Sequence, residues 1–230
     1  MPSTTHTRGL HDPAVRKVLD RLFAEAVADE TKTPSVAGTL TAWKGEPSAD
    51  ELRRISDDVA HDALLPVPPE VGTLLYQLVR ATGATTVVEY GTSYGISAIH
   101  LAAAVRDNGG GRVIGSELNE TKAKIATANI AEAGLAEYVE VRVGDARETL
   151  PQVEGPIGLL LLDGWTPLFH GVLRLLEPKL TVGSVVVADD TSLFPEKLTD
   201  YFAHVRGADS GYTSTPLPIG DGLELSVRTS

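Results

Sequence analysis

From residue 86 onward, short β-branched or leucine-rich runs alternate with stretches of helical periodicity. The strand candidates are Thr86–Glu89, Arg112–Ser116, Tyr138–Val143, Ile157–Leu162 and Ser184–Ala188. The helical candidates between them are Ile96–Arg106, Glu120–Ala133, Ala146–Leu150 and Pro167–Glu177. Strand–helix alternation predicts parallel strands joined by right-handed crossovers. Runs that are apolar on both faces, such as Leu159–Leu162, indicate central strands covered by helices on both sides.

The two ends of the chain differ from this alternating middle. We expect a loose tail at residues 1–9, and then helices that begin at Asp12-Pro13, at a capping box of Ser48 and Glu51, and after Pro66–Pro69. Thr31–Pro47 predicts a loop, because prolines and glycines interrupt it. At the other end, Pro195–Val205 predicts a helix, and Tyr212–Leu217 with Leu223–Arg228 predicts an antiparallel hairpin. We therefore expect a helical extension at 1–66 and an α/β core at 67–230.

Composition excludes several classes of protein. The net charge is −11 and there is no dense cluster of lysine and arginine, which argues against a nucleic-acid partner. No apolar run reaches the roughly 20 residues that span a membrane. The segment Met1–His11 lacks the apolar centre of a signal peptide, so we expect a cytoplasmic protein. With no cysteine, thiolate metal sites and cysteine nucleophiles are excluded.

A glycine turn follows the first strand of the alternating region. The segment Val87–Ser97 contains Gly91-x-x-x-Gly95, which does not match the G-x-G-x-x-G fingerprint of dinucleotide-binding proteins. Such a turn lies at the carboxyl edge of the sheet, where free N–H groups at a helix start favour an anionic group. Glu89 precedes the turn and can pair with an ammonium group. S-adenosylmethionine carries both an ammonium and a carboxylate, so the pattern favours this cofactor.

Polar groups also end the next two strands. Glu117 ends the second strand, where a carboxylate can accept both hydroxyls of a ribose. The third strand ends in Gly144-Asp145-Ala146, where the polar side chain of Asp145 can face an adenine edge. The carboxyl ends of parallel strands meet at one edge, so these groups and the glycine turn predict one nucleotide site.

Three aspartates follow the fourth and fifth strands. Asp163 comes directly after Leu159–Leu162, and Asp189 and Asp190 come directly after the next apolar run. Carboxylates that converge without lysine or arginine repel one another, and a hard divalent cation such as Mg²⁺ relieves that repulsion. The alternative is that Asp190 only caps the segment after it.

Together these motifs resemble the catechol and caffeoyl-CoA O-methyltransferase family. The resemblance runs from about Leu64 to Arg228 and rests on the segments VVEYGTSYGIS, IGSELN, GDARETL, LLLLDGW and VVVADD. It implies a Rossmann-like class I methyltransferase fold, with a seven-stranded, mostly parallel sheet and an antiparallel hairpin at the C-terminus. It further implies methyl transfer from S-adenosylmethionine to a small-molecule acceptor such as a catechol, and a homodimer.

The resemblance assigns a role to individual residues. The cofactor residues it implies are Val67, Glu89, Gly91, Thr92, Ser97, Glu117, Asp145, Ala146 and Asp163. The metal ligands it implies are Asp163, Asp189 and Asp190, with Asp163 also the catalytic centre. Trp165 matches an aromatic residue beside the acceptor ring. Trp43 is a second candidate for the acceptor pocket or, equally, a packing anchor.

Two positions depart from the family pattern. Asp190 stands where the family commonly has asparagine, and Thr166 stands where it often has a lysine base. Threonine cannot act as a base near neutral pH, and His61 and His170 are replacements in principle only. Three alternatives therefore stay open: a metal-independent O- or N-methyltransferase, a catalytically degenerate cofactor-binding protein and, least favoured by the glycine spacing, a nicotinamide dehydrogenase.

Overall fold

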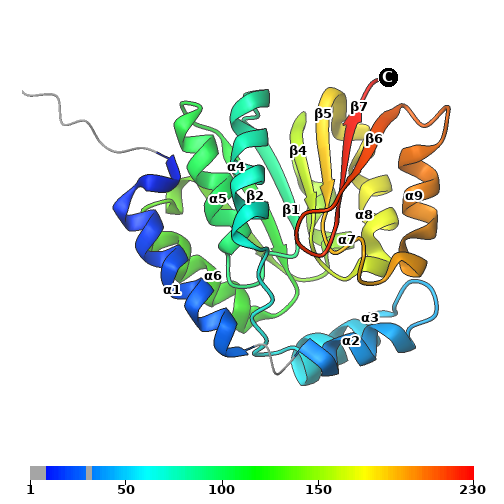
Figure 1. Cartoon of the computed structure of the whole chain (residues 1–230), viewed down its shortest axis with the longest axis horizontal. Helices are drawn as coiled ribbons and strands as arrows, with labels where there is room; N and C mark the ends of the chain where they lie inside the picture. Colours follow the sequence, from blue (N-terminus) through cyan, green and yellow to red (C-terminus); the bar gives the residue numbers. More distant parts are fainter. Residues whose placement is uncertain (1–8, 30–32) are drawn as a thin grey trace, which may run out of the picture.

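The computed structural model describes residues 9–29 and 33–230 and contains one seven-stranded sheet (Figure 1). Its strand order is β3-β2-β1-β4-β5-β7-β6. The strands are β1 Thr86–Tyr90, β2 Arg112–Glu117, β3 Val139–Val143, β4 Ile157–Leu162, β5 Leu180–Ala188, β6 Tyr212–Leu217 and β7 Leu223–Arg228. The first five strands pair in parallel, and β7 pairs antiparallel with both β5 and β6. The predicted fold class is confirmed.

Nine α-helices are found in the described part of the chain. Their bounds are α1 Pro13–Asp29, α2 Thr33–Ala42, α3 Ala49–Arg54, α4 Pro69–Thr82, α5 Ile96–Asp107, α6 Glu120–Glu132, α7 Ala146–Thr149, α8 Phe169–Leu176 and α9 Thr199–Arg206. The predicted caps are present, because the Ala14 N–H donates to Asp12 and the Ser48–Glu51 capping box forms. None of these helices is long and apolar enough to cross a membrane.

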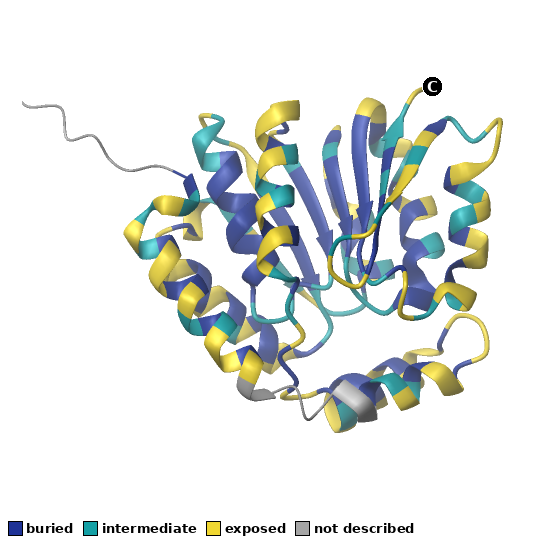
Figure 2. Ribbon diagram, viewed as in Figure 1, coloured by how far each residue is buried: buried dark blue, intermediate teal, exposed yellow. Residues whose placement is uncertain are grey.

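Alternate residues of the central strands face opposite sides of the sheet. Leu159 and Leu161 pack in one apolar cluster with residues of α1, α4, α5 and α6. Leu160 and Leu162 pack in a second cluster with residues of α2, α3, α8 and α9. The buried strands lie at the centre of Figure 2, with the exposed faces of the helices outside them. This two-sided burial is what the continuous apolar strand runs predict.

The prediction of a loop over Thr31–Pro47 is wrong for most of its length, because α2 occupies Thr33–Ala42. Pro34 lies in the first turn of α2, where a missing N–H breaks no helical hydrogen bond. Val36 and Leu40, four residues apart, are both buried and give α2 an apolar face. Tertiary packing thus outweighs the cost of Gly38. The predicted tail at 1–9 lies almost entirely outside the described residues.

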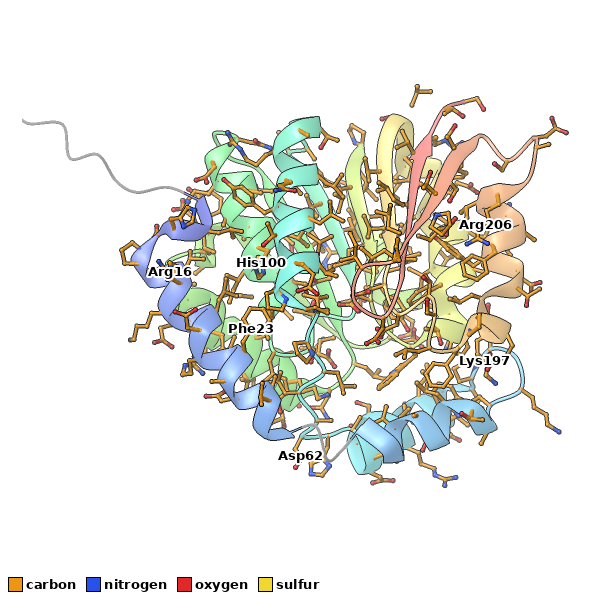
Figure 3. The ribbon with its side chains drawn as sticks, in the orientation of Figure 1. Arg16, Phe23, Asp62, His100, Lys197 and Arg206 are labelled. Atoms are coloured by element: carbon orange, nitrogen blue, oxygen red, sulfur yellow. The ribbon has the colours of Figure 1, made fainter. Side chains whose placement is uncertain are left out.

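Helices α2 and α3 run along the edge of the sheet where the parallel strands end (Figure 1). Side chains of the core hold them there. Arg147 donates to the Pro47 carbonyl at 3.4 Å, and Asn119 donates to the Ser56 carbonyl at 3.1 Å. Lys197, labelled in Figure 3, donates to the Trp43 carbonyl. The N-terminal helices therefore form a cover over the carboxyl edge.

An ion pair between an exposed arginine and a buried glutamate joins α9 to the closing hairpin. Arg206, labelled in Figure 3, donates two hydrogen bonds to Glu224, at 2.8 and 2.6 Å. The Glu224 side chain has no exposed surface. Changing Arg206 to methionine leaves this carboxylate buried without its cation. We expect the free energy of unfolding to fall by about 2 kcal/mol in urea denaturation, because Arg206 is 43% exposed and the Ser214 hydroxyl still donates to Glu224.

A surface ion pair provides the control for this prediction. Lys17 and Glu132 pair at 3.0 Å with side chains that are 76% and 39% exposed. Lys17→Met should therefore cost less than about 1 kcal/mol. Adding Glu224→Gln to Arg206→Met should recover part of the loss, because a neutral amide needs no cation. Equal effects of Arg206→Met and Lys17→Met would contradict the prediction.

Candidate functional site

A cavity of about 680 Å³ lies between the carboxyl ends of the parallel strands and the N-terminal cover. Its lining includes residues from the ends of β1 to β5, from the segment 64–69, from α1 to α3 and from the loop after β5. A smaller pocket beside it is lined by Gly91, Thr92 and Ser97 of the glycine turn. The volume of the larger cavity is within the range of small-molecule sites.

Close packing against β4 makes glycine necessary at the first position of the turn. Gly91 has φ +97°, and a Cβ atom there would lie 2.3 Å from the carbonyl oxygen of Asp163. The N–H groups of Gly91 and Thr92 both donate to the Ser116 carbonyl at 3.1 Å. The turn therefore ties the ends of β1, β2 and β4 together.

Glu89 is fully buried beneath this turn, and neither of its carboxylate oxygens has a hydrogen-bond partner among the described residues. Burial raises the pKa of Glu89 to about 7, and the nearby hydroxyls of Ser97 and Thr92 act in the opposite direction. The Thr92 hydroxyl is also buried without a partner. Orphaned buried polar atoms are costly, so they indicate a site completed by a polar ligand.

Two backbone N–H groups fix the carboxylate of Glu117 at the end of β2. Ser93 and Asn119 each donate to it at 2.8 Å, one to each oxygen. Burial raises the pKa of Glu117, which these N–H groups and Lys122 partly oppose. Glu117 lines the cavity and keeps lone pairs for a further donor, as a ribose contact requires.

Asp145, Ala146 and Val67 also line the cavity. Asp145 caps α7 and makes hydrogen bonds to Arg147 as short as 2.7 Å. Burial alone would raise the pKa of Asp145, but the hydrogen bonds and charge of Arg147 lower it. The Asp145 carboxylate is thus paired with Arg147. The backbone here and the Ala146 side chain remain available to contact a flat ring such as adenine.

The three predicted metal-ligand aspartates line the same cavity. Burial raises the pKa of Asp163 well above its usual range, and the charges of Asp189 and Asp190 raise it further. Burial and the charge of Asp190 raise the pKa of Asp189 to about 7, and burial and the charge of Asp221 raise that of Asp190 to about 6. None of the three pairs with a described lysine or arginine. The charges of these three carboxylates therefore repel one another.

This donor set fits a hard divalent cation in its chemistry. Over residues 9–29 and 33–230, however, no three carboxylate or histidine side chains already form a complete metal site. Asp190 has φ +58°, a left-handed conformation that asparagine and aspartate tolerate best. Its backbone N–H donates to the Asp189 carboxylate at 2.8 Å, which fixes the Asp189 side chain against the backbone of Asp190. A cation would therefore draw together carboxylates that are already neighbours.

The remaining candidates are the two tryptophans, Thr166 and two histidines, and only some of them line the cavity. Trp165 lines the cavity, whereas Trp43 is buried behind it, with the rings edge-to-face and their centroids 6.5 Å apart. Thr166 lines the cavity, and its hydroxyl is buried without a partner among the described residues. His61 and His170 do not appear among the described lining residues.

Sequence reasoning missed two parts of the site. Asp221, in the link between β6 and β7, lines the cavity, and its charge raises the pKa of Asp189 and Asp190. The flanking glycines of Gly220-Asp221-Gly222 mark the tight turn that brings it there. Leu193 and Phe194, in the loop after β5, form part of the wall. Nothing in the periodicity of that loop distinguishes them from ordinary surface residues.

A family model and several relatives of known name that match this chain are methyltransferases. Residues 88–191 match a family model described as a methyltransferase domain. The catechol O-methyltransferase of Niastella koreensis is 34% identical over 185 residues, which cover 70% of this chain and 81% of that protein. Catechol O-methyltransferase B of Danio rerio is 27% identical, over 94% of this chain and 84% of that one.

Solved structures agree with these sequence matches. The O-methyltransferase TomG of Streptomyces achromogenes, involved in tomaymycin synthesis and solved in complex with SAM, is 25% identical with a TM-score of 0.68. The match covers 85% of this chain and 96% of TomG. An O-methyltransferase of Bacillus cereus, solved with SAH, has a TM-score of 0.67 at 23% identity, over 88% of this chain and 97% of that one.

Proposed function

Because this chain belongs to the O-methyltransferase family that includes the catechol and caffeoyl-CoA enzymes, we propose that it methylates one of two vicinal hydroxyls of a small acceptor with the help of a divalent cation, Mg²⁺. Its cofactor is S-adenosylmethionine. The observation that carries the proposal is one cavity lined by the glycine turn, by Glu117 and by the three aspartates.

The cofactor roles follow from the groups that lack partners. Glu89 and Thr92 would receive the methionine end, where the cofactor's ammonium meets a buried carboxylate. Ser97 lines the adjacent small pocket and Gly91 allows close approach of the cofactor. Glu117 would accept the ribose hydroxyls, and Ala146 with Asp145 would border the adenine. Val67 would contact the cofactor from the segment before α4.

Asp163, Asp189 and Asp190 would hold the cation. A divalent cation at this position would supply Lewis acidity, which lowers the pKa of an acceptor hydroxyl. Asp163 also lies where β4 meets the glycine turn, so it stands between the proposed cofactor and acceptor positions. The chain's own contribution is to hold donor and acceptor in line, which needs no covalent intermediate.

No lysine base stands at Thr166, so the site differs from the family pattern in how the acceptor proton leaves. The Thr166 hydroxyl can hydrogen-bond an acceptor oxygen but not remove its proton. Asp221 is a further carboxylate on the wall that can accept a hydrogen bond from an acceptor hydroxyl. We propose that Trp165 borders the acceptor ring, that Trp43 supports it from behind, and that the described helices of the 1–66 extension cover the acceptor.

A methylation assay on catechol tests this function. We expect turnover with S-adenosylmethionine and Mg²⁺. Adding EDTA should lower the turnover rate at least about 100-fold, and restoring Mg²⁺ should recover it. Undiminished turnover in EDTA would replace the proposal with a metal-independent methyltransferase. Calorimetric binding of S-adenosylmethionine without turnover of any catechol would instead indicate a degenerate binding protein.

Removing Glu117 should weaken cofactor binding selectively. Glu117→Ala deletes the acceptor of two backbone N–H groups and of the proposed ribose hydroxyls, so we expect about 30-fold weaker S-adenosylmethionine binding by calorimetry. Glu137→Ala is the matched control, because Glu137 is an exposed glutamate after α6 that does not line the cavity. Equal affinities of the two variants would remove Glu117 from the cofactor site.

A further inference from the structure

Exposed apolar side chains gather at the mouth of the cavity. Large hydrophobic residues that are strongly exposed are few in the described part of the chain, and three of them line this cavity. These are Val27 at 70%, Leu193 at 47% and Leu65 at 36% exposure. They come from α1, from the loop after β5 and from the segment before α4, so distant segments supply one apolar rim. Solvent-facing apolar surface that gathers from separate elements marks a binding surface.

The apolar surface continues inward from this rim. Leu40 of α2 and Phe194 of the loop after β5 line the cavity on its cover side, as does Phe23 of α1. In Figure 3, Phe23 points from α1 towards the core, where its ring lies 6.4 Å from that of His100. The proposed cofactor contacts lie instead at the strand ends. Leu65 also lines the small pocket of the glycine turn, so at that residue the rim borders the proposed cofactor position, whereas Val27 and Leu193 do not line that pocket.

The charges on the cavity wall are almost all negative. Besides the three aspartates, Asp221 and Glu117 line it. Lys122 is the one lysine or arginine among the described lining residues. Its Nζ donates to the Ala63 carbonyl at 2.9 Å and lies over the Tyr94 ring, so this cation is engaged at the cofactor side. Mg²⁺ would offset the charge of the three aspartates but not that of Asp221 and Glu117, so an acceptor carboxylate distant from the cation would meet like charge.

We propose that the acceptor is a catechol carrying an uncharged apolar substituent, which lies against the apolar rim at Val27 and Leu193. This inference rests on the proposed function, because the catechol ring is placed at the aspartates. It excludes acceptors with a carboxylate or phosphate close to the ring, including coenzyme A thioesters. The apolar wall then sets specificity by removing the substituent from water.

Three related compounds separate charge from apolar length: 3,4-dihydroxybenzoate, its methyl ester and its butyl ester. Binding is measured by calorimetry to the full chain with S-adenosylhomocysteine and Mg²⁺, and turnover is measured separately with S-adenosylmethionine. We expect the butyl ester to bind about tenfold more tightly than the methyl ester, because three further methylenes leave water. The free acid should bind at least about tenfold more weakly than the methyl ester.

A pair of double variants tests the rim itself. Val27→Asn with Leu193→Asn should abolish the advantage of the butyl over the methyl ester while leaving methyl-ester binding within about twofold. Val182→Asn with Leu175→Asn is the matched control, because these residues are 69% and 41% exposed and do not line the cavity. It should leave the tenfold advantage intact.

Each outcome decides one claim. Equal binding of the two esters, tighter binding of the free acid, or an unchanged butyl advantage in the rim variant would overturn the substrate inference. If the compounds bind in the expected order but none is methylated, the apolar binding surface stands, whereas the proposed catalytic function fails and the compounds are ligands rather than acceptors. If they are methylated without any preference, the function stands and the inference fails.

Discussion

Replacing Gly91 with alanine should abolish detectable S-adenosylmethionine binding and destabilise the fold. The new Cβ would lie 2.3 Å from the Asp163 carbonyl oxygen and 2.8 Å from the Gly164 Cα, and both are backbone atoms that cannot rotate away. The φ of +97° adds left-handed strain of about 1–2 kcal/mol, and overpacking adds about 1–3 kcal/mol. We expect a loss of about 2–5 kcal/mol in urea denaturation and at least 1,000-fold weaker cofactor binding by calorimetry.

Gly183 provides a control that isolates the steric part of this effect. It has φ +90°, close to that of Gly91, but a Cβ atom there would meet nothing within 4 Å. Gly183→Ala should therefore cost only the left-handed strain and leave cofactor affinity unchanged. If the two variants lose equal stability and both bind the cofactor normally, the turn is not the close-packed cofactor element described above.

The positions of the strands along the chain and their directions were accessible from the sequence because each rests on a local pattern, whereas their order in the sheet was not predicted. Runs such as Leu159–Leu162 can only be buried on both faces, and a link rich in glycine and proline predicts the closing hairpin. Helix α2 was not accessible in this way. Pro34 and Gly38 are typical of loops in a sequence, and the burial of Val36 and Leu40 that stabilises the helix depends on tertiary packing.

The candidate site likewise contains residues that a local pattern identifies and residues whose position depends on tertiary packing. Groups at strand ends, such as Glu117 and Asp163, could be assigned because a parallel sheet brings all its carboxyl ends to one edge. Asp221 and Leu193 reach the cavity through loops whose course depends on tertiary packing, and no spacing rule identifies them. For Trp43 the sequence left two roles open, a wall of the acceptor pocket or a packing anchor. Its place behind Trp165 depends on how the N-terminal helices pack on the core.

Changing Asp163 to asparagine should lower catechol methylation at saturating S-adenosylmethionine by more than about 1,000-fold and leave the protein at least as stable. In the absence of a cation, Asp163 is repelled by Asp189 and Asp190, and its charge is costly because it is largely buried. A neutral amide of the same size removes that repulsion, so Tm without Mg²⁺ should stay the same or rise. A residue kept for packing or folding would show the opposite pattern, with stability falling along with activity.

Asp190→Asn is the matched variant, because it also neutralises one carboxylate of the three. Asparagine tolerates the left-handed backbone at this position and still offers an oxygen ligand, so turnover with Mg²⁺ should stay within about tenfold of the parent chain. Calorimetric titration of Mg²⁺ gives a second readout, with binding lost in Asp163→Asn and retained in Asp190→Asn. Full activity of Asp163→Asn in EDTA would refute the metal role. A fall in its Tm would show that Asp163 is structural, because neutralising one of three repelling carboxylates can lower stability only if that charge supports the fold.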